Sequence, residues 1–100
     1  MTKMTIGKYR GLQRLADDRG FICMCALDHR GSLAKMLKEG TGEAPSHQDM
    51  VDFKYDVTGA LSPHCSAILL DPVYGAAQTI AANLLSSSAG LAVSLEETGY

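Results

Sequence analysis

The sequence predicts an α/β fold with a parallel sheet, and three observations support this prediction. Short apolar segments lie near residues 21–28, 66–71 and 91–96, and each of them ends at an acidic side chain. Segments with helical periodicity separate them, and the first apolar segment is uninterrupted on both faces. Strands that alternate with helices form parallel sheets, and uninterrupted apolar strands are typical of sheets covered on both sides. We therefore expect three parallel strands in one domain over residues 1–100.

The composition is that of a globular domain. The chain has 100 residues, of which 46% are apolar and 20% charged, so it has room for one domain only. Its net charge is −2, and it has no cluster of Lys and Arg that would bind a phosphate backbone. No apolar run approaches the roughly 18 residues of a membrane span, and the start lacks the apolar stretch of a secretory signal. The three cysteines, an odd number, favour a reduced compartment. We expect a cytoplasmic protein that binds neither nucleic acid nor membranes.

The first elements are a short amino-terminal helix, a strand and a second helix. Residues 9–16 place apolar side chains at helical spacing, and Gly20 follows as the predicted stop. The apolar run 21–27 is typical of a strand that is buried on both faces. Ser32 then offers an N-cap for a helix over residues 33–38.

The second half of the chain repeats this alternation. Ser46 can cap a helix whose apolar stripe runs to Leu61, and Pro63 ends it. A second strand over 66–70 and a third over 91–95 follow. The helix between them is predicted to contain Ala77, Ile80, Ala81, Leu84 and Leu85. The predicted order is therefore helix, strand, helix, helix, strand, helix, strand.

An acidic residue ends each predicted strand: Asp28, Asp71 and Glu96. Parallel strands have their carboxyl ends at one edge of the sheet, where α/β folds place their active sites, so we expect the three carboxylates to gather there. Strand alternation predicts that the larger side chains at 91, 93 and 95 meet the helices, that the small side chains at 92 and 94 face inward, and that Glu96 rather than Glu97 points into the mouth. The alternative is that Asp28 and Asp71 only cap the turns that follow them.

The two residues after the first strand, His29 and Arg30, are candidates for binding substrate or phosphate. Alternatively, Arg30 forms an ion pair with a neighbouring strand-end acid. A metal site would require several of these side chains to converge, yet no ligand spacing such as HxH or CxxC is present. We therefore expect neither a metal ion nor another cofactor.

None of the five lysines lies at a predicted strand end, where a Schiff-base lysine would be expected. Lys54 differs from the other lysines because it falls inside the apolar stripe of its helix. We expect its stem to pack on the core while its ammonium reaches a nearby acid. The other lysines lie at terminal or polar helical positions, namely Lys3, Lys8, Lys35 and Lys38.

Longer motifs surround these acids, and they occupy residues 26–31, 61–63, 66–75 and 96–100. In their residues, order and spacing, the sequence resembles the class I tagatose-bisphosphate aldolases and the related fructose-bisphosphate and sulfofructose-phosphate aldolases. The resemblance covers the chain from Gly20 onward. It implies a (β/α)₈ TIM barrel of about 250 residues or more, of which this chain would supply the first three βα units after a short amino-terminal helix.

The resemblance also implies a function. Such an aldolase cleaves a phosphorylated ketohexose into dihydroxyacetone phosphate and an aldehyde, through a Schiff base on a lysine outside this chain. Asp28 and Glu96 would then be catalytic, and His29, Arg30 and Asp71 would bind substrate. The chain alone is expected to be inactive, and the enzyme is expected to be a homo-oligomer.

One position departs from the family, because tagatose-bisphosphate aldolases usually have Gln where this chain has His29. Histidine titrates near neutral pH, so it would add a pH dependence that Gln lacks. Two other interpretations remain open. The chain could be a non-catalytic βα module that acts as an interaction or assembly subunit, or a metal-dependent barrel enzyme that uses Asp28 and Glu96 as ligands.

Overall fold

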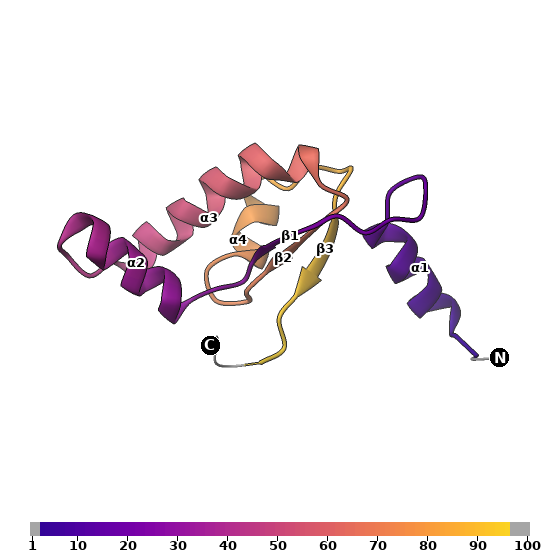
Figure 1. The fold of residues 1–100 in the computed structure, drawn as a ribbon, viewed down its shortest axis with the longest axis horizontal. Coiled ribbons are helices and arrows are strands. Elements are labelled where there is room, and N and C mark those ends of the chain that lie inside the picture. The colour runs from indigo at the N-terminus through magenta and orange to yellow at the C-terminus, as the bar shows by residue number, and fades with distance from the viewer. Residues whose placement is uncertain (1–2, 97–100) are drawn as a thin grey trace.

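The protein is an α/β structure with an open sheet of three parallel strands (Figure 1). The computed structural model describes residues 3–96. Its elements are α1 (Ile6–Leu15), β1 (Met24–Leu27), α2 (Gly31–Thr41), α3 (His47–Leu61), the 3-10 turn η1 (Ser62–His64), β2 (Ala67–Leu70), α4 (Ala76–Ala81) and β3 (Gly90–Val93). This order confirms the predicted alternation. None of the helices in residues 3–96 has the length and apolar character needed to cross a membrane.

The central strand β2 pairs with β1 on one side and with β3 on the other. Leu70 is level with Leu27 and with Val93, so the three carboxyl ends lie at one edge, as predicted. The core lies between the sheet and the helices that cover one face. It is formed by Leu27, Ile68, Leu70 and Ala76, with Cys25, Phe53, Val57, Leu85 and Leu91 packed around them. Leu91 thus faces the helices, as the alternation along the third strand predicts.

The other face of the sheet is open at β1, and here the sequence prediction is wrong. The segment 21–27 was expected to be buried on both faces, but Phe21, Ile22 and Met24 are 62%, 50% and 39% exposed. The reason is that β1 is an edge strand, and that the helices α3 and α4 pack on one face of the sheet only (Figure 1). Burial on both faces is reserved for the central strand, where Ala67, Ile68 and Leu70 are fully buried.

The starts of two helices show which local signals set a helix boundary. The Ser46 hydroxyl accepts from the Asp49 amide while the Asp49 carboxylate accepts from the Ser46 amide, so the predicted cap of α3 is confirmed as a capping box. The predicted Ser32 cap is wrong, because α2 begins at Gly31 and the Ala34 amide already bonds to the Arg30 carbonyl. Ser32 therefore lies inside the first turn.

The helix α4 is shorter than its apolar pattern predicts. It ends at Ala81, so Leu84 and Leu85 lie beyond it. Asn83 adopts a left-handed conformation with φ 60°, and the Leu84 amide bonds back to the Thr79 carbonyl at 2.9 Å. Asparagine tolerates this conformation, which ends a helix while leaving the following apolar side chains against the core.

At the amino edge of the sheet, α1 extends away from the body of the molecule (Figure 1). None of its residues is buried. It ends at Leu15, before Gly20, which forms the next turn with φ 85°, so the predicted role of Gly20 as the helix stop is wrong. The end of α1 approaches β3 so closely that a side chain at Gly90 would overlap the Arg14 carbonyl. Only glycine fits at that contact.

Candidate functional site

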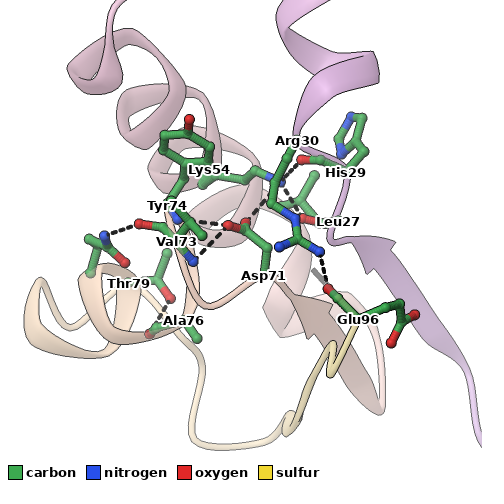
Figure 2. Close-up of polar contacts among 11 residues, drawn as sticks. Leu27, His29, Arg30, Lys54, Asp71, Val73, Tyr74, Ala76, Thr79 and Glu96 are labelled. Carbon is green, nitrogen blue, oxygen red and sulfur yellow. Dashed lines mark hydrogen bonds and ion pairs between the residues drawn. The ribbon is translucent and has the colours of Figure 1, made fainter. Parts of the chain in front are cut away.

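The carboxyl edge of the sheet brings together residues from β1, β2, α3 and the segment after β3 (Figure 2). Arg30 follows β1, and its guanidinium donates to the main-chain carbonyl of Glu96 at 2.6 Å. The bond joins the segments that follow the two outer strands. Arg30 thus bonds the main chain of a strand-end acid, and Figure 2 shows the Glu96 carboxylate pointing away from Arg30.

Lys54 lies at the centre of this edge. It is fully buried on α3, and its Nζ donates to the carbonyls of Leu27 at 2.5 Å and His29 at 2.6 Å. The same Nζ lies 3.2 Å from Oδ1 of Asp71, which is also fully buried. Two of the three ammonium donors are thus used by main-chain carbonyls, while the Asp71 carboxylate lies at ion-pair distance. The prediction that Lys54 packs its stem on the core and reaches an acid is confirmed.

Asp71 is held from a second side by the turn that follows β2. Its Oδ2 accepts from the amides of Val73 at 3.0 Å and Tyr74 at 2.7 Å. Gly75 closes this turn, and a Cβ there would lie 3.0 Å from Oδ1 of Asp71. For Asp71 the sequence left two roles open, turn capping and substrate binding, and these contacts show that it caps the turn. They also show an ion pair with Lys54 that the sequence did not assign to it.

Asp28 and His29 directly follow β1, next to the carbonyls that bind Lys54 of the buried Lys54–Asp71 pair. Both are partly buried, and the His29 ring packs edge-on against Phe53 with centroids 6.1 Å apart. Within residues 3–96 no hydrogen bond engages the Asp28 carboxylate, in contrast with Asp71. An ionised carboxylate accepts several hydrogen bonds, so Asp28 retains its capacity to accept a proton or bind a hydroxyl group.

Burial and charge shift two of these groups. Burial lowers the pKa of the Lys54 ammonium, and the nearby Asp71 carboxylate opposes this shift. Burial also lowers the pKa of His29, the Lys54 charge lowers it further, and the Asp28 and Asp71 carboxylates act in the opposite direction. The net shift favours the neutral imidazole over the charged one.

Glu96 stands apart from the buried pair. Its Oε2 accepts from the Leu95 amide at 3.1 Å, and its residue is exposed. Glu97, which was predicted to face the other way, lies outside the described residues.

Sequence analysis missed Ser94 as a site candidate. It is 7% exposed, and its Oγ has no hydrogen-bond partner within residues 3–96. The sequence signal that could have identified Ser94 is its place on the inward face predicted for the small side chains at 92 and 94. No group of three His, Cys, Asp or Glu side chains arranged for a metal ion occurs in the same part of the chain.

Comparison with known proteins identifies relatives that are named as tagatose 1,6-diphosphate aldolases. No family model matches the chain. Over all 100 residues it is 45% identical to "Tagatose 1,6-diphosphate aldolase" of Listeria monocytogenes and 41% identical to "Tagatose 1,6-diphosphate aldolase 1" of Enterococcus faecalis. It is 36% identical over 97 residues to "Tagatose 1,6-diphosphate aldolase 2" of Streptococcus agalactiae. The chain spans 28% to 29% of the length of these relatives.

Proposed function

We propose that this chain is the amino-terminal part of an aldolase that cleaves a phosphorylated ketohexose, such as tagatose or fructose 1,6-bisphosphate, to dihydroxyacetone phosphate and an aldehyde. Relatives named as tagatose 1,6-diphosphate aldolases match its whole length at up to 45% identity. The open parallel sheet fits the first three βα units of a (β/α)₈ barrel, whose active site lies at the carboxyl ends of the strands. A cytoplasmic homo-oligomer belongs to the same proposal.

The observation that supports this proposal best is the contrast between two aspartates at the strand ends. Asp71 is fully buried, with Oδ2 bonded by two amides and Oδ1 at ion-pair distance from Lys54, whereas Asp28 is partly buried and its carboxylate has no hydrogen bond within residues 3–96. We assign Asp28 as a carboxylate that contacts substrate and exchanges a proton with a substrate hydroxyl. Glu96 is the second candidate acid–base group, and His29 and Arg30 are the candidate substrate contacts. Asp71 supports this wall from within.

In a class I mechanism a lysine amine attacks the ketose carbonyl, water leaves, and the iminium ion draws the electrons of the carbon–carbon bond as it breaks. Lys54 is unsuited to this step, because its Nζ is enclosed and engaged by two carbonyls and a carboxylate. We therefore place the Schiff-base lysine outside this chain.

The direct test is the substitution Asp28→Asn in the complete gene product. Loss of a general acid–base group reduces kcat by about 10² to 10⁴-fold. Release of dihydroxyacetone phosphate from tagatose 1,6-bisphosphate measures it. Asp56→Asn on the exposed side of α3 is the matched control, and its kcat should equal that of the wild type. Equal rates for the Asp28 variant and the control would contradict the role of Asp28.

A non-catalytic assembly module is the second candidate, and the exposed face of β1 favours it, since such a face can pair with another subunit. This candidate predicts a stable oligomer of the gene product that releases no dihydroxyacetone phosphate from either bisphosphate. Turnover by the purified gene product would exclude it.

A further inference from the structure

Lys54 holds the two carbonyl groups that flank Asp28 in the chain. Its Nζ donates to Leu27 on one side and to His29 on the other (Figure 2). The backbone torsions of Asp28 and His29 lie between these two fixed oxygens. The directions in which both side chains leave the backbone are therefore set by one ammonium group that belongs to a helix.

Asp71 fixes the ammonium in turn. Its Oδ1 lies 3.2 Å from Nζ, while its Oδ2 is held by the amides of Val73 and Tyr74. The arrangement ties α3, the end of β1 and the turn after β2 to a single point. A buried ion pair is a poor device for stability, because removing two charges from water costs about as much as their attraction returns. Its position beneath Asp28 and His29 suggests a different use.

We propose that Lys54 is a positioning residue of the aldolase site, which fixes the main chain on both sides of Asp28 and so orients the Asp28 carboxylate and the His29 imidazole toward substrate. The proposal rests on the function proposed above. Asp71 has the supporting role of anchoring the ammonium. A misplacement of about 1 Å at a reacting group can reduce the rate roughly 100-fold, so such a residue can matter without touching substrate.

The charge of Lys54 has a second effect at the same place. It faces His29 together with Asp28 and Asp71, while the uncharged Phe53 ring covers one edge of the imidazole. Burial and Lys54 lower the pKa of His29, and the two carboxylates raise it. Lys54 therefore fixes the main chain at His29 through a hydrogen bond, and its charge favours the neutral imidazole.

The test compares four variants of the complete gene product with the wild type. Lys54→Met removes the ammonium, and Lys54→Met combined with Asp71→Asn also removes the carboxylate charge that would be left unpaired. Val51→Ala shortens another buried side chain of α3 and leaves the Lys54 ammonium in place, so it lowers stability while the anchor is kept. Lys35→Met removes a lysine from the exposed side of α2. The measurements are kcat, KM, Tm and hydrogen exchange of the peptide 24–31.

We expect Lys54→Met to lower kcat by about 10 to 100-fold and to speed exchange in the peptide 24–31, because the end of β1 loses its anchor. The double variant should regain part of the lost Tm but none of the lost kcat. Val51→Ala should lower Tm with kcat and exchange in this peptide unchanged, and Lys35→Met should match the wild type.

Two outcomes would overturn the proposal. One is a Lys54→Met variant that loses Tm like Val51→Ala while keeping its kcat and its exchange in the peptide 24–31. The other is a double variant that recovers kcat together with Tm, which would mean that Lys54 acts on stability alone. A wild-type protein without aldolase activity would contradict the proposed function instead, and the exchange measurement would then decide whether Lys54 anchors the strand end.

Discussion

The amino and carboxyl edges of the sheet, where the strands begin and end, are tied to the surrounding helices by different chemistry. At the amino edge a neutral hydroxyl serves: Ser66 Oγ accepts from the Cys23 amide at 2.8 Å and donates to the Leu15 carbonyl at 2.7 Å. At the carboxyl edge the ion pair of Lys54 and Asp71 occupies the corresponding place, with both side chains fully buried. At the amino edge one hydroxyl thus bonds main-chain groups of two segments. At the carboxyl edge the ammonium bonds two carbonyls at the end of β1, and the carboxylate bonds two amides of the turn after β2.

The difference indicates what each edge is for. A hydroxyl costs little to bury once it is hydrogen-bonded. The docking of α1 is therefore enough to explain the Ser66 hydroxyl at the amino edge. A buried charge pair costs several times more, and its benefit is orientation at the edge where Asp28 and His29 lie. Under the proposed function, this asymmetry separates a catalytic end of the sheet from a structural end.

Asp71→Ala should give the largest change in stability. It leaves the Lys54 ammonium buried without a counter-ion and deprives the Val73 and Tyr74 amides of their acceptor. Breaking a buried pair in this way lowers the free energy of unfolding by about 3–5 kcal/mol. Urea denaturation measures it. Asp52→Ala, whose carboxylate accepts from Gln48 on the exposed side of α3, is the control and should change it by no more than about 0.5 kcal/mol.

Ser66→Ala should give a smaller change at the opposite edge. The Cys23 amide and the Leu15 carbonyl each lose a partner, and an unsatisfied buried polar group costs about 1–3 kcal/mol. The same denaturation experiment applies, with Ser87→Ala in the exposed loop before β3 as the control. If Ser66→Ala cost as much as Asp71→Ala, the distinction between a neutral and a charged edge would be lost.

His29→Gln should have the smallest effect, visible only as a change in pH dependence. The pKa of His29 in the folded protein lies below its ordinary value of 6.5, so the unfolded chain takes up the proton first as the pH falls. The His29 side chain therefore leaves the stability of the wild type unchanged above about pH 6.5, and it lowers the free energy of unfolding as the pH falls below that value. Tm measured from pH 7.5 to pH 5 should fall less steeply for the Gln variant. Parallel curves would contradict the shift.

Much of the fold follows from local patterns. The three apolar runs that end in acids predict the strands and their common edge, and a cation inside an apolar stripe predicts the buried contact of Lys54 with an acid. These features depend on periodicity and on the cost of burying a charge, which a sequence displays directly.

Other features depend on tertiary neighbours that a local pattern does not contain. The run 21–27 is apolar throughout, yet β1 lies at an edge and exposes one face. Leu84 and Leu85 continue the helical pattern of α4, although Asn83 turns the chain before them. Asp28 and Asp71 have the same place in the pattern, but Asp71 follows the central strand, is bonded by the turn after β2 and lies beside Lys54 of α3.

The most direct test of the central claim is to treat the complete gene product with tagatose 1,6-bisphosphate and borohydride and to map any adduct by peptide mass. A trapped sugar phosphate on a lysine outside residues 1–100 is the predicted result, with Lys54 unmodified because it is enclosed at the strand end. An active enzyme that forms no adduct would contradict the Schiff-base mechanism. An adduct on Lys54 itself would contradict its assignment as a buried positioning residue.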